Sequence, residues 1–145
     1  MKIEELYQIY LSFPSVQTDT RKLQQGDIYF ALKGENFNGN AFAKEALSQG
    51  AAYCVVDEEL SFKDDRLIKV DVVLSTLQQL AKYHRQQFNI PFIAITGSNG
   101  KTTTKELIAA VLSSHFKTYT TIGNLNNHIG VPLTLLSVKS DAQMA

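Results

Sequence analysis

A short glycine-rich segment at residues 96–103 constrains this chain most, because it joins a fully apolar run to an amphipathic one. The apolar run, Phe92 to Ile95, does not alternate with polar residues, as is typical of a parallel strand covered on both faces. The segment Thr118 to Ile122 is predicted to form the next strand. Between them, five residues recur at helical spacing: Thr104, Leu107, Ile108, Val111 and Leu112. The sequence therefore predicts a β-α-β unit and an α/β fold in the second half of the chain.

The glycine-rich segment itself, Thr-Gly-Ser-Asn-Gly-Lys-Thr-Thr, has the composition of a phosphate-binding loop. Two glycines permit unusual backbone angles, so that free N–H groups can form an anion nest at a helix N-terminus. Lys101 can add a charge on the phosphates, and the hydroxyl of Thr102 can bind Mg²⁺. The spacer between the first glycine and the Gly-Lys pair is only two residues, shorter than in the usual motif. The alternative is a plain glycine turn with an exposed lysine. The predicted nucleotide-binding residues are Gly97, Ser98, Asn99, Gly100, Lys101, Thr102 and Thr103.

The first half of the chain predicts a separate, small mixed α/β domain. Strands are expected at 27–32, 52–56 and 67–70, and a loop at 34–40. Helices are expected near 3–10 and 42–47, and from a capping box at Ser75 and Gln78 to about Phe88. Pro91 breaks the pattern. We therefore expect one domain at 1–88 and the first part of a parallel-sheet domain at 89–145. On the expected elements, Cys54 is predicted to be a buried strand thiol, and His84 a packed residue at the edge of the core.

Composition excludes several classes of protein. Lys plus Arg and Asp plus Glu each number 14, so the net charge is zero and a non-specific nucleic-acid binder is not expected. The single cysteine excludes an internal disulfide. The first residues are too acidic for a secretory signal, and no apolar run reaches the ~20 residues of a membrane span. These features predict a soluble cytoplasmic protein without membrane insertion.

Three stretches together resemble the Mur ligases, ATP-dependent amide-bond-forming enzymes of bacterial cell-wall synthesis. The first is the shortened loop at 96–103. The second, Thr18 to Arg21 followed by Gly26 to Gly34, is similar to the UDP-binding domain of the members that add the third residue and the terminal dipeptide. The third, Gly123 to Leu133, resembles the dipeptide-adding member in particular. The resemblance covers the chain from residue 2 to about 138.

This resemblance implies a function in peptidoglycan synthesis, and thus in cell shape and cell division. ATP, with Mg²⁺, would phosphorylate the terminal carboxylate of UDP-N-acetylmuramoyl-tripeptide, and the amine of D-alanyl-D-alanine would displace the phosphate. Lys101 would be the catalytic residue, Thr102 the metal ligand, and the intact enzyme a monomer. Arg21 could reach a phosphate or brace its own loop, and either Asn126 or Asn127 matches a family asparagine, with Asn127 favoured. The residues implied to bind the UDP substrate are Thr18, Thr20, Arg21, Glu35, Asn36, Phe37 and Asn127.

The chain also departs from the family pattern. The family often has Asp-Gly-His where residues 38–40 are Asn-Gly-Asn, and His128 is expected to be a solvated loop residue. Family members continue further, so we expect an inactive fragment that stops within the ATP-binding domain. The ligase adding the third amino acid remains an alternative, as does a non-catalytic UDP-sugar or nucleotide-binding module. A regulatory GTPase is excluded because the guanine-reading Asn-Lys-x-Asp is absent.

Overall fold

A four-stranded parallel sheet organises the first half of the molecule in the computed structural model, which describes residues 1–123 and 125–145. Asn124, within the stretch that resembles the dipeptide-adding member, lies outside the described residues. The sheet order is β1-β2-β5-β6, and a small antiparallel hairpin, β3–β4, follows β2. The elements, in chain order, are α1 (Ile3–Ser12), β1 (Val16–Gln17), η1 (Thr20–Lys22), β2 (Ile28–Phe30), β3 (Lys33–Gly34), β4 (Phe37–Asn38), η2 (Gly39–Phe42), α2 (Ala43–Ser48), β5 (Tyr53–Val56), β6 (Leu67–Lys69), α3 (Val73–Gln86), α4 (Lys101–Ser113) and α5 (Gly130–Ser137).

Helices cover both faces of this sheet, which explains why its central strands, β2 and β5, are buried on both faces. On one face, Ile28 and Phe30 pack with α1, α3 and Leu136 of α5. On the other face, Tyr29 and Cys54 pack against α2. The prediction that Cys54 is a buried strand thiol is confirmed, and burial raises the pKa of this thiol to about 12.

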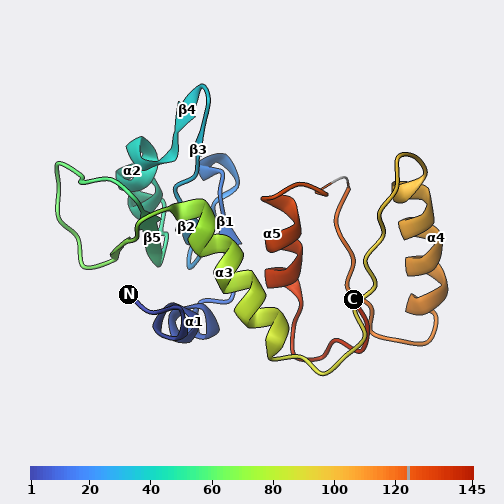
Figure 1. Ribbon diagram of the computed structural model, residues 1–145. Coiled ribbons are helices and arrows are strands. Elements are labelled where there is room, and N and C mark those ends of the chain that lie inside the picture. The colour runs from blue at the N-terminus through green and yellow to red at the C-terminus, as the bar shows by residue number, and fades with distance from the viewer. Residues whose placement is uncertain (124) are drawn as a thin grey trace.

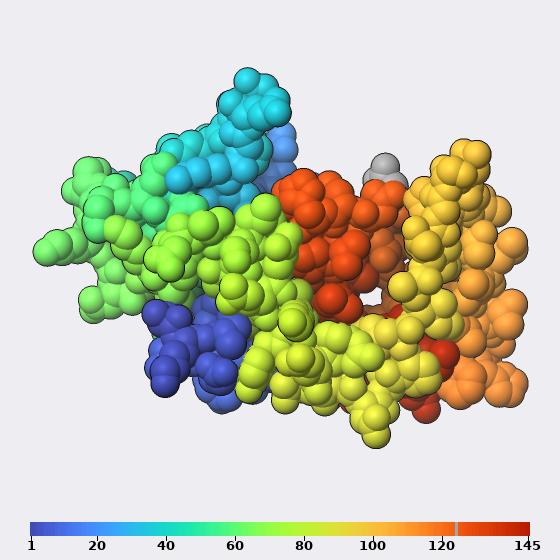
Figure 2. All heavy atoms as spheres, viewed as in Figure 1, coloured from blue at the N-terminus to red at the C-terminus, as the bar shows by residue number. Residues whose placement is uncertain are grey.

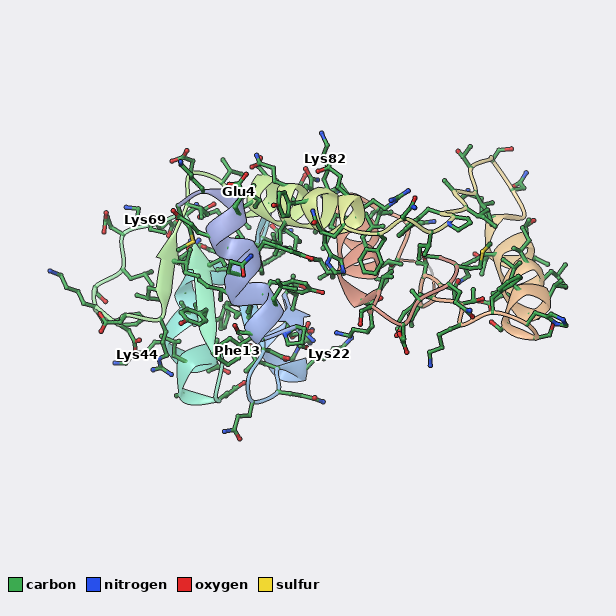
Figure 3. All side chains as sticks on the ribbon, turned by 90° about the horizontal axis from the view of Figure 1, so that it is seen from below. Glu4, Phe13, Lys22, Lys44, Lys69 and Lys82 are labelled. Carbon is green, nitrogen blue, oxygen red and sulfur yellow. The ribbon has the colours of Figure 1, made fainter. Side chains whose placement is uncertain are left out.

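Charged side chains of the helices and of β6 lie on the outside of the molecule. Glu4 on α1, Lys22 on η1, Lys44 on α2, Lys69 on β6 and Lys82 on α3 are all exposed (Figure 3). Within residues 1–123 and 125–145, no helix is both long and apolar enough to span a membrane.

The second half of the chain returns to the first half through α5. Figure 1 shows α5 beside α3, with α4 standing apart on the far side of the molecule. The Tyr10 hydroxyl donates to the carbonyl of Leu136 at 2.5 Å, and His84 Nε2 lies 2.9 Å from the carbonyl of Val138. His84 is buried, as predicted. The two halves therefore share one continuous core across α3 and α5.

Several local predictions were wrong. Residues 92–95 and 118–122 do not form regular strands. They flank residues 143–145, and only short pairs form, such as Ile93 N–H to the Ala145 carbonyl at 2.8 Å and Tyr119 N–H to the Met144 carbonyl at 3.0 Å. Within the described residues, only one isolated bridge forms, between Thr118 and Met144, so no continuous ladder is built. On α4, the predicted apolar face is not buried, since Leu107 is 65% exposed.

The predicted capping box of α3 was also wrong. The helix begins at Val73, two residues before Ser75. Its N-cap residue, Val72, makes no side-chain capping hydrogen bond. Instead, the carboxylate of Asp57, at the end of β5, accepts from the Val73 N–H at 3.3 Å. Asp57, which is distant in sequence, thus accepts a hydrogen bond at the start of the helix, where Ser75 was expected to do so.

Candidate nucleotide and substrate site

The glycine-rich loop leads directly into α4 and leaves its first N–H groups free for a ligand. Gly100 is the N-cap, with φ of 76°, a conformation that side-chain-bearing residues rarely adopt. Among the described residues, no side chain caps this helix. The first intrahelical hydrogen bond is made by the N–H of Thr104, to the Gly100 carbonyl at 2.9 Å. The N–H groups of residues 101–103 therefore precede it, as in an anion-binding helix N-terminus.

Lys101 lies in the first turn of α4 and folds back over this loop. Its Nζ donates to the carbonyl of Gly97 at 2.6 Å. Ser98, Asn99, Thr102 and Thr103 are exposed. The lysine thus lies within reach of any anion that the loop holds, at the cost of one bond to a carbonyl. These residues fit the phosphates of a nucleotide.

Thr102 is the one predicted metal ligand, and it is accessible beside Lys101. Its hydroxyl suits Mg²⁺, which prefers oxygen ligands and retains waters and phosphate oxygens in its shell. Within the part of the chain that the structure describes, no group of three or more His, Cys, Asp or Glu side chains gathers as a metal site. Thr102 is thus the residue that would hold Mg²⁺ here, together with bound phosphates.

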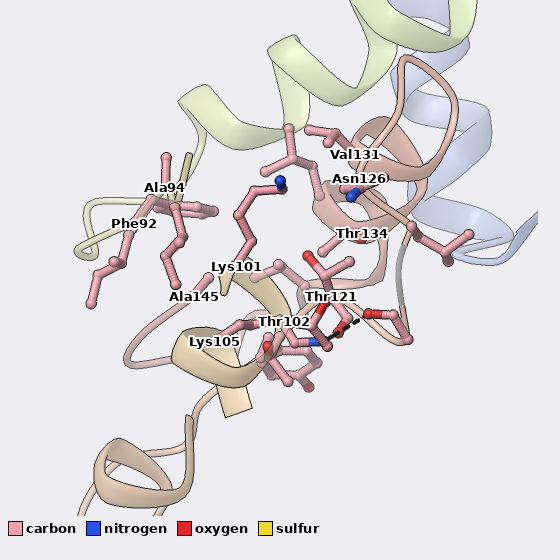
Figure 4. A pocket seen from close by; sticks show the side chains of 18 of the residues that line it. Phe92, Ala94, Lys101, Thr102, Lys105, Thr121, Asn126, Val131, Thr134 and Ala145 are labelled. Carbon is pink, nitrogen blue, oxygen red and sulfur yellow. Dashed lines mark hydrogen bonds between the residues drawn. The ribbon is translucent and has the colours of Figure 1, made fainter. Parts of the chain in front are cut away.

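A cavity of about 450 Å³ lies beside the loop, between α4 and α5. Figure 2 shows the molecule hollowed at this place. Lys101, Thr102 and Asn126 line it, together with apolar side chains such as Phe92 and Val131 (Figure 4). Lys101 and Thr102 of the phosphate loop and α4 therefore line the same cavity as Asn126.

Asn127, the asparagine favoured from sequence, has a different local role in the structure. Its side-chain oxygen accepts from the N–H groups of Ile129 at 3.0 Å and Gly130 at 2.7 Å, so it caps the start of α5. Its neighbour Asn126 faces the cavity instead. His128 is exposed, as predicted for a solvated loop histidine.

The predicted substrate-binding residues of the first half follow the carboxyl ends of neighbouring parallel strands. Thr18 to Arg21 follow β1, and Glu35 to Phe37 form the hairpin after β2. In open α/β sheets, ligands bind at this edge. Thr18 and Thr20 are half-buried, whereas Glu35, Asn36 and Phe37 are exposed.

Arg21 forms a two-pronged ion pair with Asp19. Its Nε donates to Oδ1 at 2.9 Å and its Nη2 to Oδ2 at 2.7 Å. The hydrogen bonds from Arg21 lower the pKa of Asp19 to about 2. Without a ligand, Arg21 therefore braces its own loop, and its side chain stays exposed.

A polar network fastens the β3–β4 hairpin to the end of β5. Lys33 Nζ lies 2.9 Å from both Asp57 and Glu58, and buried Asn40 exchanges hydrogen bonds with Asp57 at 2.9 and 3.1 Å. Burial acts to raise the pKa of Asp57, but hydrogen bonds from Lys33 and Asn40 outweigh it and lower that pKa. At the position where the family often has histidine, Asn40 therefore holds the hairpin in place.

The β3–β4 hairpin and the glycine-rich loop lie on the same side of the molecule. Figure 1 shows the β3–β4 hairpin, the N-terminus of α5 and the N-terminus of α4 all at its upper side, with α1 below. Gln78 Nε2 on α3 donates to the carbonyl of His128 at 3.0 Å, which holds the loop before α5 against the first half. A ligand extending from the hairpin toward the glycine loop would therefore cross one continuous face.

Lys105 is a residue that sequence reasoning missed. It lies one turn after Lys101 on α4, and its Nζ donates to the carbonyls of Thr121 at 2.7 Å and Gly123 at 2.8 Å (Figure 4). The only signal in the sequence is a second lysine at helical spacing after the first.

Comparison with protein families and known proteins agrees with these features. Residues 13–110 match the family model described as "Mur ligase family, catalytic domain", and residues 95–145 match "Mur ligase middle domain". A relative from Bacillus subtilis, named UDP-N-acetylmuramoyl-tripeptide–D-alanyl-D-alanine ligase, is 44% identical over 132 residues. That match covers 90% of this chain but 29% of the relative, so the chain spans less than a third of its length.

Two solved structures share the fold. The MurF ligase of Acinetobacter baumannii superposes with a TM-score of 0.83 at 37% identity, over 90% of this chain and 29% of that one. The MurF ligase of Thermotoga maritima, solved in complex with ADP, gives a TM-score of 0.81 at 30% identity, over 92% of this chain and 31% of that one. The predicted α/β fold class with a parallel sheet is confirmed.

Proposed function

Because the chain belongs to the Mur ligase family, we propose that it supplies the substrate-binding and nucleotide-binding side of an ATP-dependent amide ligase of peptidoglycan synthesis. In this proposal the enzyme joins D-alanyl-D-alanine to UDP-N-acetylmuramoyl-tripeptide, the reaction in the name of the Bacillus subtilis relative. One observation carries the proposal most directly. The glycine loop that the family pattern predicts lies at the uncapped N-terminus of α4, with Lys101 folded over it.

The work is divided between the two parts of the chain. Residues 1–88 bind the UDP end of the substrate, through the segment from Thr18 to Arg21 and the hairpin tip at Glu35 to Phe37. Residues 89–145 begin the ATP-binding domain. The shared face between hairpin and glycine loop supports this division, because the substrate's reacting carboxylate lies at the opposite end from its uridine.

At the glycine loop, backbone N–H groups and Lys101 hold the nucleotide phosphates, and Thr102 offers an oxygen to Mg²⁺. ATP supplies the phosphoryl group that activates the substrate carboxylate. Lys101 leaves the Gly97 carbonyl and neutralises charge on the transferring group, which is the main demand of phosphoryl transfer. Asn126, in the cavity wall, is placed to orient a polar group beside it. We further propose that the enzyme acts as a monomer in the cytoplasm, where ATP and UDP-linked precursors are available.

A chimera tests this function. This chain replaces the matching 132 residues of the Bacillus subtilis relative, and mass spectrometry follows formation of UDP-N-acetylmuramoyl-pentapeptide from the tripeptide substrate and D-alanyl-D-alanine. We expect ATP-dependent product, and a loss of at least about a hundredfold in Lys101→Met, as for removal of a charge-stabilising group. Lys82→Met, an exposed lysine on α3, serves as the matched control and should retain activity.

The result also separates the related reactions. If the Lys101→Met chimera kept the activity of the parent chimera, the proposed role of the glycine loop would be wrong. If the chimera instead joined a free amino acid to the UDP-linked dipeptide, the chain would be part of a ligase that adds the third residue.

A further inference from the structure

Lys105 is held in an unusually well-defined environment for a lysine on a helix that buries none of its side chains. Its side chain is only 15% exposed. Its Nζ lies 2.7 Å from the Thr121 carbonyl, 2.8 Å from the Gly123 carbonyl and 2.9 Å from Glu106 Oε1. An ammonium group has three N–H donors and no acceptor, so these three oxygens match its capacity.

This geometry separates Lys105 from Lys101, although the two lie one turn apart. Lys101 can swing from the Gly97 carbonyl to a phosphate by giving up a single hydrogen bond in an exposed position. Lys105 would have to leave two backbone carbonyls that point toward the same site. Without the ammonium group, the part-buried carbonyl of Thr121 would lose its donor, which costs free energy. Lys105 is therefore arranged to stay where it is.

The two carbonyls belong to the segment that leads into the cavity wall. Tyr119 to Thr121 line the cavity before it, and Leu125 and Asn126 line it after Gly123. Since α4 offers little apolar packing, the bonds from Lys105 are the polar link that fixes this segment to the helix carrying the glycine loop. Figure 4 shows them between Lys105 and the cavity wall.

We propose that Lys105 is a positioning residue of the nucleotide site, which fastens residues 121–123 to α4 and so holds Asn126 at a set distance from the glycine loop. This inference rests on the proposed nucleotide binding, but not on the identity of the amide that the enzyme forms. Lys105 itself does not contact phosphate. It fixes the carbonyls of Thr121 and Gly123 to the helix that carries Lys101.

The test uses the ¹⁵N-labelled chain of 145 residues with Lys105→Met, which keeps length and helix propensity, and Lys105→Arg, which keeps the charge. Lys117→Met is the control, because Lys117 is 60% exposed and lies outside the cavity wall. Two quantities are measured: heteronuclear NOE values without ligand, and amide shifts on titration with ADP. Amides of β2 and β5 report whether each variant is folded.

Without ligand, Lys105→Met should lower the NOE values of residues 121–123 while those within α4 stay unchanged, and Lys105→Arg should restore part of the loss. With ADP, residues 97–103 should still shift in Lys105→Met, but the shifts of residues 125 and 126 should be lost. The Kd for ADP should rise about fivefold, as for loss of the one neutral hydrogen bond of about 1 kcal/mol that Asn126 would make. Lys117→Met should behave as the unsubstituted chain.

Unchanged NOE values at 121–123 in Lys105→Met would overturn the inference, whatever ADP does. If the ADP shifts at 97–103 were also lost, the unchanged NOE values would show that Lys105 binds phosphate directly. If ADP shifted nothing in the unsubstituted chain, the proposed nucleotide binding would fail, and the NOE values alone would decide whether Lys105 fastens the segment.

Discussion

His84 connects three segments of the chain through its two ring nitrogens. Nδ1 lies 3.1 Å from the Tyr7 hydroxyl, and Nε2 lies 2.9 Å from the Val138 carbonyl. A carbonyl oxygen only accepts, so Nε2 carries the proton and Nδ1 accepts from Tyr7. A second proton would remove the acceptor that Tyr7 uses. The contact between α1, α3 and the end of α5 therefore depends on a neutral imidazole.

Burial lowers the pKa of His84, the nearby charge of Lys139 lowers it further, and the bond to Val138 acts in the opposite direction. Because the folded-state pKa lies below the ordinary value of 6.5, protons bind more tightly to the unfolded chain. We expect the free energy of unfolding to be constant above pH 6.5 with respect to this group, and to fall as the pH drops below that value.

Urea unfolding at several pH values, compared with His84→Gln, measures this effect. Glutamine can donate to Val138 but does not titrate, so its pH slope should be smaller than that of the unsubstituted chain. His115 and His128 are exposed and present in both proteins, so their contributions cancel. An equal slope in the two proteins would show that His84 is not the group responsible.

At the scale of elements, the β3–β4 hairpin depends on Asn40. This side chain is only 2% exposed, and it bonds both to Asp57 and to the side-chain oxygen of Asn38. Asn40→Ala leaves the backbone N–H of Asp57 without its acceptor, so it should destabilise the chain by roughly 1–3 kcal/mol. The hairpin tip should also bind the UDP-linked substrate more weakly, while ADP binding is unchanged.

Asn36→Ala is the matched control for stability, because Asn36 lies at the exposed tip of the same hairpin. Its free energy of unfolding, from urea denaturation, should stay within about 0.5 kcal/mol of the unsubstituted chain. Equal stability of Asn40→Ala and Asn36→Ala would mean that the network around Asp57 does not hold the hairpin.

The elements that sequence predicted well are those specified by local patterns. Strands β2 and β5 lie in continuous apolar runs, and α1 and α3 have apolar residues at helical spacing. What could not be predicted depends on distant partners. The start of α3 is satisfied by Asp57 from another strand, and α5, which contains Pro132, was not anticipated because it packs on α3. Its helix is stabilised by burial rather than by local propensity.

In the candidate site, too, local patterns were predictable and contacts between distant residues were not. The glycine loop was found from sequence because its chemistry requires particular residues at short spacing. Lys105 was missed because its carbonyl partners lie 16 and 18 residues further along the chain. The preference for Asn127 over Asn126 rested on resemblance alone, whereas the structure uses the Asn127 side chain to cap α5.

On the scale of the whole molecule, α5 brings the two proposed binding regions to one side. It follows the glycine-loop helix in sequence, yet it packs against α3 of the first half. The hairpin, the start of α5 and the start of α4 are thereby held along the upper face in Figure 1. The central claim is that the UDP end of the substrate and the nucleotide phosphates occupy two separate regions of this one face.

Amide shifts of the ¹⁵N-labelled chain, titrated separately with UDP-N-acetylmuramoyl-tripeptide and with ADP, test this claim most directly. We predict that the UDP-linked ligand perturbs residues 18–21 and 34–37, and that ADP perturbs residues 97–103, with α1 on the opposite side unaffected by either. Addition of one ligand should leave the shifts caused by the other in place. Perturbation of residues 97–103 alone by the UDP-linked ligand, or of the hairpin by ADP, would contradict the account.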